Sequence, residues 1–501
     1  MGLGHSPRIV TENLVLLLDA ANPRNFNLTA VEVLVVAGGG GGGNHHGGGG
    51  GAGGLIYNSN FAVTPGTQLT VTVGDGGAAR SYGGGNGGNG GNSVFGALTA
   101  IGGGGGGSYP NNGSGGGSGG GSTNWSVGTT GGTGTSGQGF AGGSNNGQNN
   151  FGGGGGGAGG TAKGLYNNSG GDGLAYNISG NQTYYSGGGG SGVYPGYGND
   201  TSYGFGGLGG GGNGGNGPHG SGTAPTAGGT NTGGGGGGVA DLYQNSAIGG
   251  SGIIIVRYQG PQRAIGGTVT SVGGDTIHTF TTSGNFTPLV NTNGSAVLGL
   301  SDLSGNRNFG TTAGSPIYNS ANGGSLVFEG SDEYVSMGSL GSGFSNFTVE
   351  IWFKSDSVAN YRNPIDCNFL IEFAGSYSNL GPRLEQNSSG NLAWLVGSGS
   401  DVYTSINVVS SGLDGSKYHY AAITKSSSTL FTTYYNGSAV TSTNFSNWTG
   451  SMLNVNIGRG FSLSGERWFI GKIPSVKIYN RALSAAEISQ NYNALRGRFG
   501  L

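Results

Sequence analysis

The stretch Val31-Glu-Val-Leu-Val-Val-Ala37 runs directly into six consecutive glycines, Gly38–Gly43, and this junction decides the fold. The segment Val31–Ala37 is typical of a strongly apolar β-strand. Another apolar segment, Ile253-Ile-Ile-Val-Arg-Tyr258, closes the glycine-rich region. A flexible linker needs neither equal blocks of glycine nor a strand at each end. Three further runs of six glycines lie between the two apolar segments, at Gly102–Gly107, Gly152–Gly157 and Gly233–Gly238.

Equal glycine blocks bounded by strands predict that backbone packs directly against backbone. Only glycine lets chains approach with no Cβ between them, as on the collagen axis. An extended helix with three residues per turn has no internal hydrogen bonds, so its N–H and C=O groups must pair with neighbouring helices or with water. Ordering glycine costs about 1–2 kcal/mol per residue or more, so order must be collective. We expect a polyglycine-helix bundle capped by β-strands; the alternative is a disordered spacer.

Composition excludes several classes of protein. The 501 residues include 124 glycines, only 8% are charged and the net charge is −2, whereas roughly a quarter of an ordinary soluble domain is charged. The glycines follow no Gly-X-Y register, which excludes collagen. No cluster of Lys and Arg supports binding to nucleic acid or to an anionic membrane. The single cysteine, Cys367, excludes an intrachain disulfide and is compatible with synthesis in a reducing cytoplasm.

Segments along the chain differ in composition and divide it into four parts. We predict an N-terminal segment over residues 1–30, a glycine-rich domain over 31–260, a β-rich connector over 261–292 and an all-β sandwich over 293–501. No segment is apolar for long enough to span a bilayer, and the N-terminus lacks the pattern of a secretion signal.

The sandwich domain shows clear local signals. Phe347-Thr-Val-Glu-Ile-Trp-Phe353 alternates apolar and other residues, so Phe347, Val349, Ile351 and Phe353 are expected on one face of a strand. Asn436-Gly437 is a strong hairpin signal. Ser484-Ala-Ala-Glu487 forms a capping box, which predicts a helix over 485–495 that stops near Gly497.

Residues 325–495 resemble the concanavalin A-like, laminin-G-like jelly roll. In that family a leading strand like Asn13-Leu-Val-Leu-Leu-Leu-Asp19 stands shortly before a loop like Ser301-Asp-Leu-Ser-Gly-Asn306, and here residues 20–300 separate the two. The resemblance therefore implies that residues 1–30 hold the first strand of the jelly roll and that the glycine-rich domain is inserted after it. The alternative is a succession of separate units. The matching segments are Ser325-Leu-Val-Phe-Glu-Gly-Ser-Asp-Glu-Tyr-Val335, Phe347–Phe353, Tyr435-Asn-Gly437 and Val476-Lys-Ile-Tyr-Asn-Arg-Ala-Leu-Ser-Ala-Ala-Glu-Ile488.

Residues 31–258 resemble the glycine-rich domains of phage tail-fibre and adhesin-type proteins. Some phage adhesins of that class stack polyglycine helices and display variable loops at one end. The two resemblances together are typical of virion surface proteins of tailed phages, made in the host cytoplasm, with a tail fibre favoured over the capsid. The matching segments are Val33-Leu-Val-Val-Ala-Gly-Gly39, Gly51-Ala-Gly-Gly-Leu55, Val71-Thr-Val-Gly74 and Gly250-Ser-Gly-Ile-Ile-Ile-Val-Arg-Tyr258.

Loops between the glycine blocks are rich in Tyr, Trp, Asn and Ser, a mixture that makes adaptable recognition surfaces. Aromatic faces stack on sugar rings, while amides and hydroxyls pair with sugar hydroxyls. The alternative is that these aromatic residues only fill space in a scaffold short of apolar area. The candidate ligand-binding residues are Tyr109, Trp125, Tyr184, Tyr185, Tyr194, Tyr197 and Tyr203.

Catalytic and metal-binding patterns are weak. No acidic pair stands out on one strand for glycoside hydrolysis, so we expect no enzyme and name no catalytic residue. His45-His46 has no Cys, Asp or Glu at ligand spacing, which favours a structural or solvated pair over a metal site. Some relatives of the sandwich hold calcium near loops like those of Asp302, Asp332 and Glu333, which makes these three candidate ligands; we expect no other cofactor.

These observations favour a non-enzymatic fibre or adhesin component that recognises a host-surface glycan or outer-membrane receptor through many weak contacts. The jelly roll would bind carbohydrate or dock to other virion proteins. The rivals are a capsid decoration or head-fibre protein with a docking role only, and a surface-polysaccharide depolymerase. A homo-oligomer is expected, with a trimer as one candidate although no heptad repeat specifies it. Neither nucleic-acid binding nor membrane insertion is expected.

Overall fold

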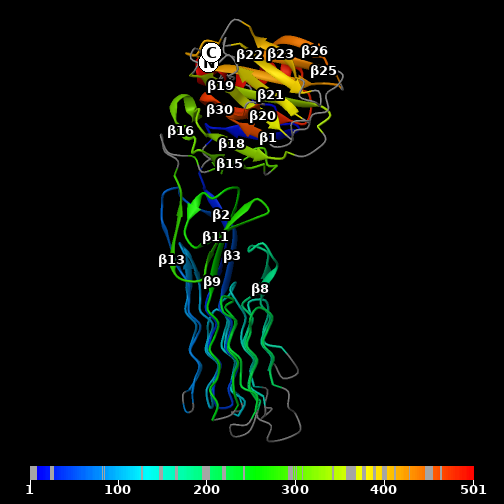
Figure 1. Ribbon diagram of the computed structural model, residues 1–501. Helices are drawn as coiled ribbons and strands as arrows, with labels where there is room; N and C mark the ends of the chain where they lie inside the picture. Colours follow the sequence, from blue (N-terminus) through cyan, green and yellow to red (C-terminus); the bar gives the residue numbers. More distant parts are fainter. Residues whose placement is uncertain are drawn as a thin grey trace, which may run out of the picture. The chain divides into compact units, whose positions relative to one another are not determined.

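The chain folds into two compact units, each described by itself (Figure 1). The jelly-roll unit comprises Met1–Leu28, Gln259–Arg263 and Leu289–Leu501. The glycine-rich unit comprises Thr29–Tyr258 and Ala264–Pro288. The computed structural model describes all residues except 1–7, 23–26, 82, 84, 126–127, 146–150, 164–167, 194–202, 217–221, 241–242, 291–296, 298, 301, 307, 341–343, 357–367, 375–379, 387–390, 398–402, 411–412, 428, 446–454 and 463–464.

In the described part of the jelly-roll unit, two antiparallel sheets of eight strands each face one another, which confirms the all-β prediction. One sheet has the order β16 (Ile317–Asn319), β17 (Ser325–Glu329), β30 (Ile470–Tyr479), β19 (Phe347–Ser355), β24 (His419–Lys425), β25 (Leu430–Tyr435) and β26 (Ser438–Asn444), with β1 (Leu14–Asp19) also paired to β30. The other has the order β14 (Gly299–Leu300), β15 (Gly310–Ala313), β18 (Tyr334–Gly338), β27 (Val455–Ile457), β20 (Asn368–Ala374), β21 (Leu380–Gln386), β22 (Leu392–Gly397) and β23 (Tyr403–Val409). A separate hairpin joins β28 (Arg459–Ser462) to β29 (Gly465–Trp468), and short 3-10 turns cover Ala321–Gly323 and Gly497–Phe499.

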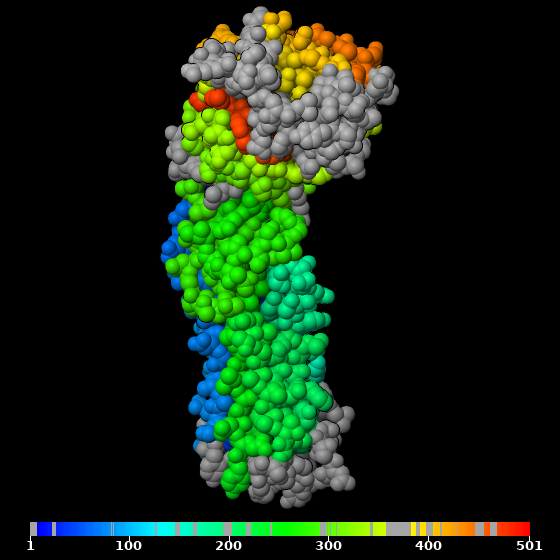
Figure 2. All heavy atoms as spheres, viewed as in Figure 1, coloured from blue at the N-terminus to red at the C-terminus, as the bar shows by residue number. Residues whose placement is uncertain are grey.

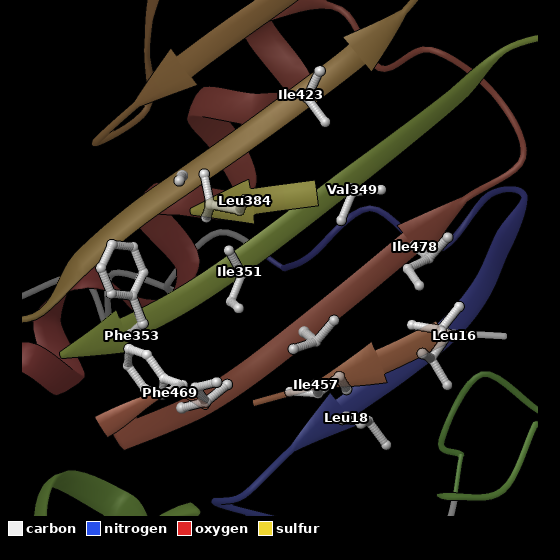
Figure 3. Close-up of a cluster of buried hydrophobic side chains, with 14 of the residues drawn as sticks. Leu16, Leu18, Val349, Ile351, Phe353, Leu384, Ile423, Ile457, Phe469 and Ile478 are labelled. Carbon is white, nitrogen blue, oxygen red and sulfur yellow. The ribbon is translucent and has the colours of Figure 1, made fainter. Parts of the chain in front are cut away.

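The core of this unit lies between the two sheets (Figure 3). Strand alternation directs Phe347, Val349, Ile351 and Phe353 of β19 into it, as expected, and all four side chains are buried. Leu16 and Leu18 of β1 belong to the same cluster. The N-terminal strand is therefore an integral part of the sandwich.

The helix α1 (Ala485–Arg496) covers the outer face of the first sheet, and its bounds agree with the predicted 485–495 to within one residue. The capping box is present: the Ser484 hydroxyl accepts from the Glu487 N–H at 3.3 Å, and Glu487 Oε2 accepts from the Ser484 N–H at 2.8 Å. Ile488 packs with the buried rings of Trp352 and Tyr479 on the sheet. Among the described residues, no helix is both long and apolar enough to cross a membrane.

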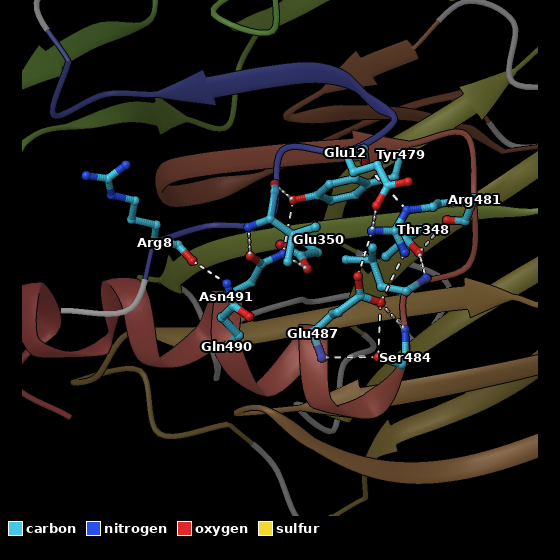
Figure 4. A network of polar contacts seen from close by, with 12 residues as sticks. Arg8, Glu12, Thr348, Glu350, Tyr479, Arg481, Ser484, Glu487, Gln490 and Asn491 are labelled. Carbon is cyan, nitrogen blue, oxygen red and sulfur yellow. Dashed lines mark hydrogen bonds and ion pairs between the residues drawn. The ribbon is translucent and has the colours of Figure 1, made fainter. Parts of the chain in front are cut away.

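A buried polar network joins the N-terminal segment to α1 (Figure 4). Asn491 Oδ1 accepts from the Val10 N–H at 2.7 Å, and its Nδ2 donates to Glu350 Oε1 at 2.8 Å. Lys477 Nζ lies 3.0 Å from Glu350 Oε2, and both side chains are almost fully buried. The amide of Asn491 thus connects the start of the chain, β19 and the C-terminal helix.

Strand pairing shows where the glycine-rich unit enters the jelly roll. β1 pairs with β30 from Leu14 opposite Tyr479 to Asp19 opposite Ser475. The chain then leaves the jelly-roll unit after Leu28 and re-enters it at Gln259, so the glycine-rich unit is an insertion after the first strand. The predicted connector 261–292 is not one piece, because residues 264–288 group with the glycine-rich unit.

Hydrogen bonds with a period of three show that Gly38–Gly43 is an extended three-residue helix. Residues three apart donate to the same neighbouring helix, and successive residues donate to different ones. The donor–acceptor pairs are Gly38–Gly91, Gly41–Gly88, Gly39–Gly250, Gly42–Ala247, Gly40–Gly51 and Gly43–Gly48. The carbonyl groups of Gly38–Gly43 accept hydrogen bonds from three further helices. With the acceptor written first, these pairs are Gly38–Gly103, Gly41–Gly106, Gly39–Gly77, Gly40–Gly236 and Gly43–Val239.

At many positions the helices of the bundle pack so closely that only glycine fits between them. A Cβ added to Gly40 would overlap the carbonyl oxygen of Gly104, which is itself fixed by a hydrogen bond from the Gly51 N–H. Figure 2 shows segments far apart in the sequence lying against one another along this unit. The bundle matches the predicted polyglycine packing.

Side chains accept from some backbone N–H groups in place of a carbonyl. Asn92 Oδ1 accepts from the Gly102 N–H at 2.8 Å, and Asn89 Oδ1 accepts from the Gly105 N–H at 2.9 Å. Asn213 does the same for the Gly206 N–H at 2.9 Å. Part of the asparagine content of this region is therefore structural.

Strands cap the bundle at one end, as predicted. β2 (Ala30–Val36) leads through Ala37 into Gly38–Gly43, and the returning helix runs into β3 (Leu55–Ala62). One sheet has the order β11 (Thr268–Val272), β12 (Asp275–Phe280), β9 (Ile253–Gln259), β2 (Ala30–Val36) and β3 (Leu55–Ala62). The second has the order β10 (Ala264–Ile265), β13 (Gly284–Pro288), β4 (Leu69–Thr72), β5 (Ser93–Phe95) and β6 (Leu98–Ala100), and β7 (Leu174–Tyr176) pairs with β8 (Thr183–Tyr185).

The substitution Gly40→Ala is expected to lower the free energy of unfolding of the glycine-rich unit by at least about 3 kcal/mol, because the new Cβ meets hydrogen-bonded backbone that cannot move aside. Calorimetry or chemical denaturation of the full chain measures this. Gly160→Ala is the matched control, since nothing lies within 4 Å of a Cβ at Gly160. Equal stability of the two variants would contradict the packing argument.

The substitution Asn491→Ala is expected to lower the free energy of unfolding of the jelly-roll unit by about 2–4 kcal/mol, because a buried carboxylate and the N-terminal backbone both lose a partner. Thermal unfolding of the full chain provides the measurement. Asn493→Ala, on the same helix, removes a hydrogen bond to Ser489 and is expected to change stability by no more than about 0.5 kcal/mol. Unchanged stability of the Asn491→Ala protein would show that the N-terminal strand does not depend on this contact.

Candidate functional site

The polyglycine helices have two different ends. At one end they continue into the strands of the sheets, and at the other they reverse in turns that carry side chains (Figure 1). Three of these turns, which we call the distal turns, are residues 44–46, 108–112 and 123–125. Hydrogen bonds place them together: the Tyr109 N–H donates to the His45 carbonyl and the Asn124 N–H donates to the His46 carbonyl, each at 3.0 Å.

The distal turns bring four rings into a continuous row, which we call the ring row: Tyr109, His45, His46 and Trp125. The centroid of the Tyr109 ring lies 5.4 Å from that of His45, and the two imidazole centroids are 4.9 Å apart. The rings of His46 and Trp125 follow at 4.6 Å. These separations are those of favourable aromatic pairs.

The ends of the ring row are exposed and its interior is supported. Tyr109 and Trp125 expose 41% and 43% of their surface, whereas His46 exposes only 8%. His45 is half-buried. The row therefore has exposed aromatic rings at its two ends and a buried imidazole between them.

Backbone contacts hold the turn of the two histidines in place. Both residues adopt a positive φ, 52° for His45 and 57° for His46, which L-residues rarely take. The His46 N–H donates to the Ala240 carbonyl at 3.0 Å, and the Thr123 hydroxyl donates to the His46 carbonyl at 3.0 Å. The rings are thus presented by fixed backbone, which lowers the ordering cost of binding.

Burial keeps the two imidazoles neutral at pH 7. It lowers the pKa of His45 from 6.5. Burial and the neighbouring His45 lower the pKa of His46 to about 4, against a hydrogen bond with Asn124 that acts in the opposite direction. The ring row is therefore an uncharged surface near neutral pH.

The aromatic residues singled out in the sequence occupy different places. Tyr109 and Trp125 lie in the ring row. Tyr185 exposes only 3% of its surface and belongs to a core cluster with Leu34 and Ile253, so it is a core residue rather than a ligand contact. Tyr184 is exposed on β8 but lies on the hairpin, away from the ring row.

The remaining aromatic candidates do not join the ring row in the described part of the chain. The ring of Tyr203 lies 5.5 Å from that of Phe205, on a different segment of the bundle. Tyr194 and Tyr197 lie outside the described residues.

His45 and His46 are the site residues that sequence reasoning missed. The sequence predicts a structural or solvated pair, and the structure places both rings between those of Tyr109 and Trp125, with His46 buried and His45 half-buried. The signal that could have found them is their position in a short turn between two glycine runs. Tyr109 and Trp125 occupy the same kind of turn.

The candidate calcium ligands make hydrogen bonds within their own loops. Asp302 Oδ1 accepts from the N–H groups of Leu17 and Ser304, at 3.1 and 2.8 Å. Glu333 Oε2 accepts from two backbone N–H groups, which lowers the pKa of its carboxyl although burial opposes this. Asp332 Oδ1 accepts from the Ser331 hydroxyl at 3.3 Å. Among the described residues no group of three or more His, Cys, Asp or Glu side chains could hold a metal ion.

Acidification tests the role of His46. Its pKa is 6.5 in the unfolded chain and about 4 in the folded one, so the stability due to the neutral imidazole is complete above pH 6.5. As the pH falls from 6.5 to about 4, the unfolded chain binds a proton that the folded chain does not, and this stability is lost. The unfolding temperature of the native chain should therefore fall more steeply over this window than that of His46→Phe, which keeps a ring and cannot titrate. The same pH dependence of the unfolding temperature in both proteins would contradict the burial of a neutral His46 side chain.

Comparisons with known proteins support the division into two kinds of domain. Residues 22–259 match the model of a glycine-rich domain. Residues 329–489 match the model of the concanavalin A-like lectin/glucanases superfamily. The comparison with curated proteins found no match.

Solved structures similar to this chain include receptor-binding domains of botulinum neurotoxins. The binding domain of neurotoxin DC in complex with rat synaptotagmin II is 15% identical, with 40% of this chain and 52% of that chain covered and a TM-score of 0.32. A neurotoxin type C structure, whose title states that cell entry depends on two ganglioside molecules, is 17% identical over 40% and 51%, with a TM-score of 0.32. This chain spans about half the length of these structures. The two family models thus match the glycine-rich unit and the part of the jelly-roll unit that follows the insertion.

Proposed function

We propose that the chain is a non-enzymatic recognition protein on the virion surface of a tailed phage, acting as a fibre or adhesin component. In this proposal the glycine-rich unit binds a glycan or receptor on the surface of the host cell. The observation that carries it is the ring row, whose exposed aromatic residues stand on fixed turns at the end of a rigid bundle.

The physical design suits recognition better than catalysis. A bundle held together by backbone hydrogen bonds leaves its side chains at turns and edges, so sequence can vary there at little cost to the fold. Tyr and Trp supply large contact areas with few rotatable bonds. Several copies on one particle would add avidity to weak individual contacts. The jelly roll, in turn, would bind carbohydrate or dock the chain to other virion proteins, in a homo-oligomer.

Binding to intact cells tests this proposal. Labelled full-length protein is applied to a panel of bacterial strains, and the retained label is measured by flow cytometry. Retention on at least one strain is expected, with a loss of at least tenfold in the variant Tyr109→Ala/Trp125→Ala, because the exposed faces of the ring row are removed.

The matched control is Phe140→Ala, which removes an exposed aromatic side chain of the same unit outside the ring row and should leave retention unchanged. Failure of every strain to retain the protein, or full retention of the double variant, counts against the proposal.

Immunogold labelling of intact particles distinguishes a fibre from the rival role of capsid decoration. Label on tails supports a fibre, and label on heads favours capsid decoration.

A further inference from the structure

The chemistry of the ring row narrows the kind of ligand it can take. We propose that the distal turns bind an uncharged saccharide chain, whose pyranose rings stack on Trp125, His45 and Tyr109. This inference rests on the proposed function and goes beyond it by naming the ligand class and by adding His45 to the contact residues.

Geometry is the first argument. The ring centroids of Tyr109 and His45 are 5.4 Å apart, a step comparable with the length of one pyranose unit. The buried His46 ring lies between those of His45 and Trp125, at 4.9 and 4.6 Å from them. A chain of sugars can therefore place neighbouring units over Tyr109 and His45 and continue past His46 to Trp125. The C–H groups on the faces of pyranose rings carry partial positive charge and are attracted to the negative faces of aromatic rings.

Charge is the second argument. The distal turns, residues 44–46, 108–112 and 123–125, contain no Lys, Arg, Asp or Glu. The half-buried Arg80 is connected to them through Asn86: its Nε donates to the Asn86 carbonyl at 2.7 Å, and Asn86 Nδ2 donates to the Asn112 carbonyl at 2.8 Å. The distal turns themselves therefore offer no ionic partner to an anionic or a cationic ligand. Their polar side chains are amides, hydroxyls and the two imidazoles, which pair with sugar hydroxyls without a formal charge.

Available amide groups are the third argument. Asn111 and Asn112 are exposed in the turn that carries Tyr109. Asn112 uses its Oδ1 to accept from the Thr130 N–H at 2.9 Å, so its orientation is fixed while its side-chain N–H groups remain donors. Stacking faces beside oriented amides are the combination that fixes both the plane and the hydroxyl pattern of a sugar.

His46 has a different role from the other three rings. It exposes only 8% of its surface and packs against Trp125 at 4.6 Å. It therefore acts as a positioning residue, holding the indole in place from behind without touching the ligand. A ring of similar size should serve the same purpose.

Titration of the full-length protein with defined oligosaccharides tests the proposal. The neutral probes are maltohexaose, cellohexaose, isomaltohexaose and a mannan hexasaccharide; the anionic probes are a hyaluronan hexasaccharide and a sialic acid oligomer. Saturation-transfer NMR and titration calorimetry are the measurements. At least one neutral probe should bind at least tenfold more tightly than either anionic probe, and Trp125→Ala, Tyr109→Ala and His45→Ala should each weaken its binding.

Further variants separate contact from folding. Phe140→Ala should bind as the native chain does. His46→Ala should weaken binding about tenfold, and His46→Phe should restore it, which a general loss of stability would not produce. Thermal unfolding of each variant confirms that it is folded at the temperature of the titration.

Two outcomes overturn the proposal: failure of every neutral probe to bind, and equal or tighter binding of an anionic probe. Cells that retain the protein give a second readout, in which periodate treatment should abolish retention. Loss of retention after protease treatment alone would identify a protein receptor, which overturns the saccharide ligand but leaves the adhesin proposal standing. Binding of a neutral probe by a protein that no cell retains supports the saccharide ligand and overturns the adhesin proposal.

Discussion

Hydrogen bonding between backbones that carry no Cβ atoms is the interaction on which the glycine-rich unit depends. Successive residues of Gly38–Gly43 donate hydrogen bonds to different neighbouring helices, so no helix is stable without those around it. Glycine has the highest ordering cost of any residue, and that cost is offset only when many helices order together. This part of the chain must therefore either fold as a bundle of many helices or remain unfolded.

The same constraint decides where side chains can stand. Positions such as Gly40 admit only a hydrogen atom, and the side chains buried along the helices are small, such as those of Ala52 and Ser118. Larger residues stand at turns, edges and the capping sheets. Asn89 and Asn92 at the edges replace missing backbone partners. Tyr109, His45 and Trp125 at the turns have exposed or half-exposed rings. A scaffold without side chains thus concentrates its chemistry at its ends.

The jelly roll accommodates the insertion because its first strand is held from two sides. β1 pairs with β30 along its length, and Leu16 and Leu18 enter the core between the sheets. Asn491 of the C-terminal helix fixes Val10 just before the strand. The long insertion enters as a loop, whose closure entropy grows only slowly with length, so the sandwich need not be weakened by it.

The sequence by itself determined the local structure: hexaglycine runs between strands, the alternation of Phe347–Phe353 and the capping box at Ser484 each follow from neighbours in the chain. It also indicated the insertion, through the resemblance of residues 13–19 to a leading strand. Only the tertiary structure decided that Tyr185 is core while Tyr109 and Trp125 are joined by His45 and His46. Glycine runs of similar composition carry no information about which helix lies beside which, and the turns that meet at the end of the bundle depend on that order.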